Sequence, residues 1–307
     1  ALTLAFVSGL TSLGFQVTWN RLLGAGTGSS TDVFTIILVL FLVGIAIGAA
    51  LVGWLRPRVR PTTLLIAMAQ LATTVFVIIG AAVLAAPQSP FNGSSPEFMK
   101  ALRDFATSSA IVVLPATIAM GIVFPATAAL LGDEHGTEGS ATGTLLAVNT
   151  GGSLVATFVL PFFVIPLIGS PATLALLAIV NAVIAGALLL GERRLGNAAR
   201  WAGGMASAAV SILVIVTLVG GTAFRNPTIQ LVESKGGTIF ETAEDEIAAT
   251  EAGQVGGTRL LWVGGTAMTL LTVDTKFMPL LPIAMRPDAD RGLAIAFGMG
   301  SAFRTSL

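Results

Sequence analysis

The chain has 307 residues, of which 54% are hydrophobic and only 10% are charged, and its mean hydropathy is +0.89. Soluble domains usually carry about 25% charged residues, so this composition predicts that most of the chain faces lipid. A net charge of zero gives no basic surface for nucleic acid, the absence of cysteine excludes disulfides and thiolate sites, and the single histidine, His135, excludes a histidine-rich metal site.

Apolar segments fill the chain up to about residue 221, and each is long enough to cross a bilayer core of about 30 Å. They lie at residues 1–23, 32–55, 63–86, 105–131, 141–168, 170–191 and 202–221. The first ends in "VTWNRLL" without a small-residue cleavage site, so it is interpreted as a span and not as a signal peptide. Kinks or tilts are expected at the prolines of the fourth and fifth spans, Pro115, Pro125, Pro161 and Pro166. The pattern predicts a polytopic all-α membrane bundle of about seven helices over residues 1–221.

The composition changes at Thr222, where a second region begins. "TIFETAEDEIAATEAGQVGGTRLLWVGGTAMTLLTV" alternates short β-rich runs with glycine and acidic turns, which is typical of hairpins. The final stretch, "RGLAIAFGMGSAFRTSL", is interpreted as a buried strand, a glycine turn and the first residues of a helix. Residues 222–307 are therefore expected to form a soluble β-rich segment and the first strand and turn of an incomplete Rossmann-like α/β domain.

Arginine placement predicts the orientation of the bundle. Two connections contain six of the nine lysines and arginines that precede residue 222: Arg56, Arg58 and Arg60, and Arg193, Arg194 and Arg200. Four predicted spans separate these connections, so both lie on one side, which the positive-inside rule makes cytoplasmic. The span at 202–221 then places the residues after 222 outside the cytoplasm.

The first span ends with three polar residues, Gln16, Asn20 and Arg21, within two turns. Gln16 and Asn20 are four residues apart and share a helix face. One interpretation is an interfacial anchor, with Trp19 in the aromatic belt and Arg21 snorkelling. The other is a polar cluster that faces a cavity between helices.

Further polar and small residues in the spans predict helix packing. In "LLAVNTGGSL", Asn149, Thr150 and Ser153 are able to hydrogen-bond across helices, while Gly151 and Gly152 permit close approach. The pair Gly44 and Gly48 in "GIAIG" forms a small-xxx-small seam. An acidic loop, "GDEHGTEG", contains Asp133, Glu134, His135 and Glu138 and is interpreted as solvated, with no metal site.

Several of these stretches, in this order, resemble bacterial membrane-embedded spermidine synthase-like proteins, which fuse a polytopic N-terminal domain to an aminopropyltransferase-type domain. The first span resembles their opening "E-x-x-W-x-R" helix, with Trp19 and Arg21 matching and Gln16 at the acidic position. "LPATIAMGIVFP" and "GTLLAVNTGGSL" resemble their mid-domain segments, the latter with Leu146 at a tyrosine position. "RLLWVGGTAMTLLTVDTKFMPLLPIAMRPDADRGLAIAFGMGS" is similar to the passage that leads into their nucleotide-binding motif.

The resemblance implies an integral protein of the bacterial inner membrane and a donor of the decarboxylated S-adenosylmethionine type. In soluble spermidine synthases the passage before the nucleotide motif carries an acidic pair and a tyrosine–histidine–glutamate run that helps to hold the amine. Here Asp274 remains near the acceptor position, whereas Thr275 replaces the second carboxylate and Phe277, Met278 and Pro279 replace the run. A cationic polyamine needs carboxylates in place of its lost hydration, so amine binding in the usual manner is not expected.

The glycine loop "AFGMGSA" supplies the candidate cofactor residues: Gly298, Gly300 and, as a candidate N-cap, Ser301. Ala302 and Phe303 depart from a dinucleotide fingerprint, so the loop fits the methyltransferase-like branch better than an NAD site. The ribose-binding carboxylate and the aspartate base of an aminopropyltransferase are expected beyond Leu307. No catalytic residue is therefore assigned, and the 307 residues alone are not expected to transfer an aminopropyl group.

Three functions remain open from the sequence. The first is a spermidine synthase-like membrane enzyme, although an extracytoplasmic domain conflicts with a cytosolic donor. The second is a non-catalytic membrane subunit or scaffold that packs against partner membrane proteins or further copies of itself. The third is a transporter whose substrate contacts Gln16 and Asn149, for which neither a repeat nor a buried charge is evident.

Overall fold

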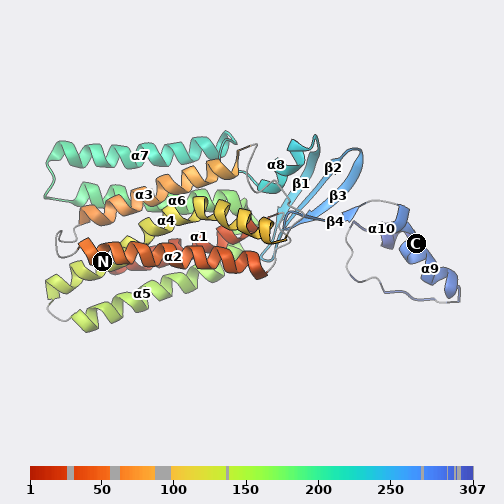
Figure 1. The fold of residues 1–307 in the computed structure, drawn as a ribbon, viewed down its shortest axis with the longest axis horizontal. Helices are drawn as coiled ribbons and strands as arrows, with labels where there is room; N and C mark the ends of the chain where they lie inside the picture. The colour runs from red at the N-terminus through yellow and green to blue at the C-terminus, as the bar shows by residue number, and fades with distance from the viewer. Residues whose placement is uncertain are drawn as a thin grey trace.

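The computed structural model describes residues 1–25, 31–55, 63–86, 98–135, 138–270, 273–288, 290–293, 295 and 299–306. Long helices lie side by side in one bundle, and a small sheet stands at one end of it (Figure 1). Beyond the sheet, two short helices complete the described chain.

The bundle consists of α1 (Leu2–Gly24), α2 (Thr31–Leu55), α3 (Thr63–Leu84), α4 (Phe98–His135), α5 (Glu138–Val159), a π-helix (Leu160–Val164), α6 (Ile165–Gly191) and α7 (Asn197–Val219). Six helical segments in the described residues are long and apolar enough to cross a membrane. The fifth of these, Thr142–Gly191, has 50 residues and covers both predicted spans, 141–168 and 170–191, apart from residue 141.

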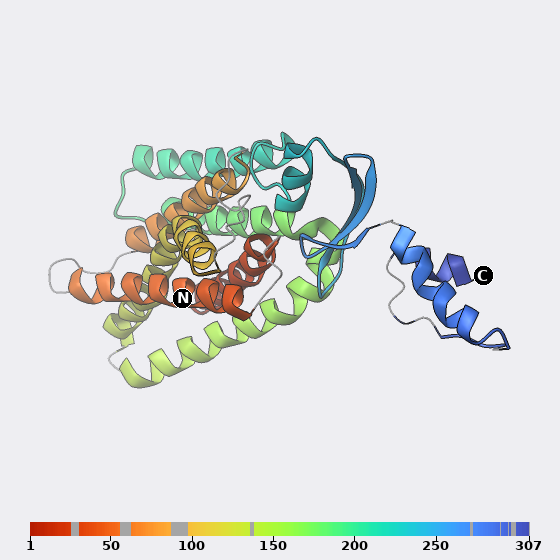
Figure 2. The ribbon, with the colours of Figure 1, turned by 45° about the vertical axis from the view of Figure 1, so that its right-hand side comes forward.

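This 50-residue segment breaks at Gly169, whose φ of 79° and ψ of 161° are not helical. Before the break, Pro161 lies in the π-helix, because a residue without an N–H cannot continue the α-helical hydrogen-bond ladder. Figures 1 and 2 show that the chain runs along α5 to the sheet end of the bundle and returns along α6. The predicted irregularity is therefore confirmed at Pro161, and the reversal falls at the residue that separates the two predicted spans.

The other predicted boundaries lie within a few residues of the observed ones, except that α7 begins at Asn197 and not at residue 202, and that α4 also begins earlier. This helix begins at Phe98 and not at residue 105. The predicted span began later because it was placed on the apolar stretch, which follows Lys100, Arg103 and Asp104. The helix continues through Pro115 and Pro125 as a single element.

The predicted glycine seam of α2 is confirmed as a contact with α4. A Cβ atom added at Gly44 would collide with Thr117, and one at Gly48 with the carbonyl oxygen of Ile118. Gly121 of α4 lies equally close to the backbone of Ile45, so glycines on both helices bring the two backbones together.

The main core lies where α1 meets its neighbours, and Trp19 is at its centre. Trp19 is 1% exposed, stacks on Phe15 at a centroid distance of 5.5 Å and meets Phe41 edge-on at 6.2 Å. The expectation of Trp19 in an interfacial aromatic belt is therefore wrong, because its ring is enclosed by other aromatic side chains. Ala223 and Phe224 join the same cluster, so the segment after α7 remains in contact with the bundle.

The sheet confirms the predicted hairpins. After α8 (Pro227–Ser234), the strands β1 (Thr238–Glu244), β2 (Ala249–Val255), β3 (Thr258–Val263) and β4 (Thr266–Leu270) form an antiparallel meander in chain order. Two-residue turns with positive φ at both positions, Gly256–Gly257 and Gly264–Gly265, close the last two hairpins. Two glycines suit the type I′ turn, whose twist matches that of the strands. The connection between α6 and α7 lies at the opposite end of the bundle from this sheet (Figure 1).

The last elements are α9 (Val273–Met285) and α10 (Ser301–Ser306). Gly300 has a φ of 68° directly before α10, as expected for a glycine turn that enters a helix. The buried strand expected before this turn is absent from the described residues, where Leu293 and Ile295 are 86% and 83% exposed. The described strands β1–β4 are all paired antiparallel, so they supply no parallel neighbour for such a strand.

Candidate functional site

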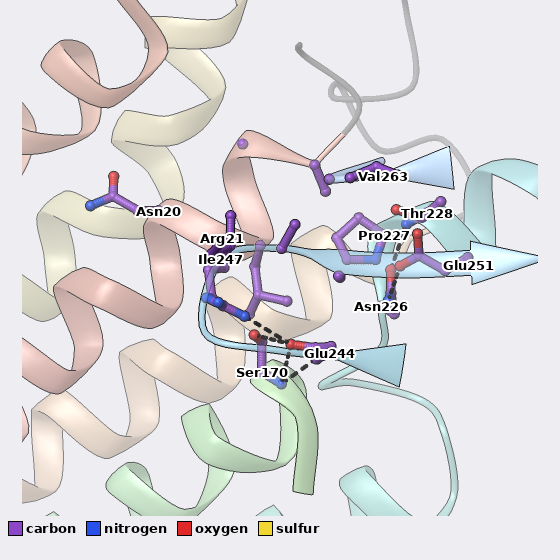
Figure 3. Close-up of a pocket in the computed structure, with 16 residues that line it drawn as sticks. Asn20, Arg21, Ser170, Asn226, Pro227, Thr228, Glu244, Ile247, Glu251 and Val263 are labelled. Atoms are coloured by element: carbon purple, nitrogen blue, oxygen red, sulfur yellow. Dashed lines mark hydrogen bonds and ion pairs between the residues drawn. The ribbon is translucent and has the colours of Figure 1, made fainter. Parts of the chain in front are cut away.

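A pocket of about 410 Å³ lies between the end of the bundle and the sheet, and it is called the junction pocket below. Its polar lining comes from α1, α6, the segment that enters α8, and the strands β1 and β2 (Figure 3). The polar residues that line it are Asn20, Arg21, Ser170, Asn226, Thr228, Glu244 and Glu251.

The first polar group in the junction pocket joins Glu244 to two helices. Both carboxylate oxygens of Glu244 accept from the backbone N–H of Ser170, at 3.1 and 3.0 Å, and one also accepts from the Ser170 hydroxyl at 2.5 Å. Arg21 Nη1 lies 3.5 Å from Glu244 Oε2, and Arg21 Nη2 donates to the Asp245 carbonyl at 2.6 Å. The Arg21 and Glu244 side chains are only 15% and 10% exposed.

The break at Gly169 explains why this carboxylate binds there. A helix that starts at residue 170 presents backbone N–H groups without partners and the positive end of its dipole. Glu244, from the end of β1, satisfies the N–H of Ser170 and brings a negative charge to that helix end. The sheet therefore supplies the N-terminal cap of a membrane helix.

The second polar group is built around Glu251 on β2, which is fully buried. Asn226 Nδ2 donates to Glu251 Oε1 at 2.8 Å, while Asn226 Oδ1 accepts from the Thr228 N–H at 2.8 Å and so caps α8. Burial is the main cause that raises the pKa of Glu251; the Asn226 hydrogen bond lowers it, and the charge of Glu244 raises it further.

Some buried polar atoms of the lining have no hydrogen-bond partner among the described residues. They include Glu251 Oε2, Thr228 Oγ1 and Asn20 Oδ1. Figure 3 shows Glu251 and Thr228 close together beside Asn226, and Asn20 turned away from them. Since buried polar groups are almost always hydrogen-bonded, Glu251 and Thr228 are residues of this lining whose polar atoms need a further partner.

The three polar residues predicted in the first span lie in different surroundings, and two of them line the junction pocket. Arg21 and Asn20 line the junction pocket, which lies between the bundle and the sheet and not between helices alone. Gln16 is half-buried and does not line it. Arg21 is held by Glu244 and Asp245 and does not snorkel freely at an interface.

Asn149 belongs to helix packing. Its backbone carbonyl lies against Gly9 of α1, one turn from Ser153, whose hydroxyl donates to the Gly9 carbonyl at 3.2 Å. Gly152 faces Phe6 closely, whereas a Cβ at Gly151 would meet nothing within 4 Å. Only Gly152 of the two predicted glycines therefore permits close approach.

The candidate residues of the α/β region lie away from the junction pocket. Asp274 is exposed in the first turn of α9. Ser301 is the first residue of α10, and the Gly300 carbonyl accepts from the Arg304 N–H at 2.8 Å. The N-cap is therefore Gly300, and the prediction of Ser301 at that position is wrong. Gly298 lies outside the described residues.

No group of three or more metal-ligating side chains occurs among the residues searched, which are the described ones. The predicted acidic loop contains the last residues of α4, up to His135, and the first residues of α5, from Glu138. Residues 136–137 and the side chains of residues 131–141 lie outside the part of the chain that the structure describes.

Four residues of this lining were not predicted from the sequence: Ser170, Asn226, Glu244 and Glu251. The acidic residues were assigned to turns, although Glu251 lies inside the β-rich run "ATEAGQV". An acidic residue at an inward position of a strand was the available signal, but its partners come from distant segments. Comparison with family models, curated proteins and solved structures finds no match to this chain.

Proposed function

We propose that the chain is a spermidine synthase-like integral membrane protein, in which a helical bundle anchors an aminopropyltransferase-like region. The observation that supports this is the order of elements after the bundle: an antiparallel meander, α9, a positive-φ glycine at 300 and α10. The sequence resemblance rests separately on the order of motifs along the chain. The resemblance implies a decarboxylated S-adenosylmethionine-type donor at Gly298, Gly300 and Ser301, with Asp274 near the acceptor.

The proposed topology has seven crossings in the bacterial inner membrane. The reversal at Gly169 supports counting Thr142–Gly191 as two crossings. The connection with Arg193 and Arg194 lies at the end away from the sheet, which supports a cytoplasmic position for that end and an extracytoplasmic one for the residues after 222.

Donor binding by the purified membrane protein in detergent tests the proposal. Calorimetric titration with decarboxylated S-adenosylmethionine and with 5′-methylthioadenosine is expected to give saturable binding. Gly300→Ala is expected to abolish it, because a Cβ at a φ of 68° strains the glycine turn. Gly236→Ala, which carries the same strain at a φ of 71° away from the loop, is expected to bind as the parent does.

A non-catalytic membrane subunit is the second candidate, and α9 favours it. None of its residues is buried, and Phe277, Met278 and Leu281 are 53%, 67% and 62% exposed on it. Such an apolar surface is typical of a protein–protein contact. Absence of donor binding in the parent protein, together with co-purification of a membrane partner that Phe277→Ser releases, would establish this function instead.

A further inference from the structure

The junction pocket lies at the level where membrane helices end. Helix α1 ends at Gly24 and the second half of the 50-residue segment starts at Ser170, and both residues line the pocket. Asn226 follows Ala223 and Phe224, which are buried in the bundle core, so the residues around Glu251 lie directly beyond the bundle.

An apolar, outward-facing surface leads along the helix to this pocket. Four side chains of the segment that precedes Gly169 are exposed: Phe162 (54%), Phe163 (63%), Leu167 (82%) and Ile168 (47%). In a bilayer this surface contacts acyl chains, and it ends next to Ser170 in the pocket wall. A lipid whose chains lay on this surface would bring its head group to the level of Ser170.

The charges in the pocket favour a cationic hydrogen-bond donor. The lining contains one arginine and two glutamates, and Arg21 and Ser170 already satisfy Glu244. Among the described residues, Glu251 accepts a hydrogen bond only from Asn226, so its Oε2 and the neighbouring Thr228 Oγ1 are left as acceptors. A primary ammonium group has three N–H donors, enough for both acceptors.

We propose that the junction pocket binds an ethanolamine phosphate group, the head group of an ethanolamine phospholipid, with its ammonium on Glu251 and Thr228. Because the Glu251 side chain is fully buried, binding includes a rotation of its carboxylate toward the pocket. Arg21, whose Nη1 makes an ion pair with Glu244 but no hydrogen bond to any described residue, is the cationic group of the pocket for the phosphate. The proposal does not depend on aminopropyl transfer.

Native mass spectrometry of the protein in nanodiscs tests this inference. The discs contain equal amounts of phosphatidylethanolamine, phosphatidylcholine and phosphatidylglycerol with identical acyl chains. Retention of phosphatidylethanolamine is expected to exceed that of phosphatidylcholine by about ten-fold or more, since a trimethylated ammonium donates no N–H bond to a charged acceptor. Mono- and dimethylated ethanolamine lipids are expected to fall between the two.

Two matched variants test whether Glu251 causes the preference for phosphatidylethanolamine. Glu251→Gln is expected to abolish the preference, whereas Glu233→Gln, at an exposed glutamate of α8 paired with Arg225, is expected to keep it. Equal retention of the ethanolamine and choline lipids, or an unchanged preference in Glu251→Gln, would overturn the proposal.

A competition experiment with phosphoethanolamine distinguishes a membrane lipid from a soluble ligand that carries the same ethanolamine phosphate group. If the site takes a membrane lipid, millimolar phosphoethanolamine is expected to leave the retained lipid in place. If phosphoethanolamine displaces the lipid from the parent protein but has no effect on Glu251→Gln, the same ammonium chemistry serves a soluble ligand.

Discussion

At the scale of single residues, Glu244 joins three segments that are distant in the sequence, through Arg21, Ser170 and its own strand. Glu244→Gln removes the negative charge at a helix N-terminus and leaves a mostly buried arginine without its counter-ion. We expect a loss of about 2–3 kcal/mol in the free energy of unfolding, since hydrogen bonds to charged groups contribute about that much. Thermal unfolding in detergent measures it.

Glu241→Gln is the control for this prediction, because Glu241 is exposed on the same strand. Equal melting temperatures for the two variants would show that Glu244 does not hold the sheet on the bundle.

Glu251 gives the stability a pH dependence of known sign. Its pKa is raised in the folded protein, so the folded state binds the proton more tightly than the unfolded chain does. Stability is therefore lost as pH rises from the ordinary pKa of 4.5 through the raised value, and stays lost above it. Glu251→Gln keeps an acceptor for Asn226 and does not titrate, so its melting temperature relative to the parent is expected to rise over that interval.

Unfolding scans of Glu251→Gln and the parent protein from pH 4 to pH 8 check this prediction. A relative stability of Glu251→Gln that does not change with pH would contradict it. A stable Glu251→Gln protein also ensures that a loss of lipid preference in this variant is not a loss of fold.

At the scale of elements, the contact between α2 and α4 depends on the absence of side chains. Gly48→Leu would drive a side chain into the Ile118 carbonyl and separate the helices, whereas a Cβ added at Gly53 on the same helix meets nothing within 4 Å, so Gly53→Leu is the control. We expect Gly48→Leu to lose several kcal/mol, or to fail to accumulate as a monodisperse protein, since overpacking a fixed backbone contact is strongly destabilising. Size-exclusion chromatography and thermal unfolding compare the two variants.

The break in the 50-residue segment makes a second test at this scale. Gly169→Ala places a Cβ at a φ of 79°, which costs about 1–3 kcal/mol. Gly191→Ala, at the other end of α6 with open space around it, is expected to be neutral in the same unfolding assay. Similar melting temperatures for the two would show that residue 169 does not need glycine.

Local signals explain which elements were predictable from the sequence. The "GIAIG" seam, the Gly-Gly turns and the division at Gly169 are each set by residues within a few positions, and each was located correctly. Trp19 was misplaced because an aromatic residue near a helix end has the same sequence signature whether it faces lipid or other rings. The partners of Arg21 lie far along the chain, and no local pattern encodes them.

At the scale of the whole molecule, the proposed topology makes a prediction that needs no knowledge of activity. Reporter fusions after Arg60 and Arg200 are expected to indicate the cytoplasm, and a fusion after Gly236 the opposite side, because α7 crosses between them. Paired alkaline phosphatase and green fluorescent protein fusions measure this. A cytoplasmic signal at Gly236 would invert the assignment and make a cytosolic donor accessible to the region after the bundle.

The interaction between Glu244 and Ser170 also has a consequence for biogenesis. During synthesis, the start of the helix at Ser170 leaves the ribosome 74 residues before the carboxylate that caps it. Until β1 has been made and placed, that helix end meets the interface with its first N–H unsatisfied by protein. Completion of the membrane part therefore depends on folding outside the membrane, and a chain stopped between α7 and β1 would hold an unfinished bundle that membrane quality control is able to recognise.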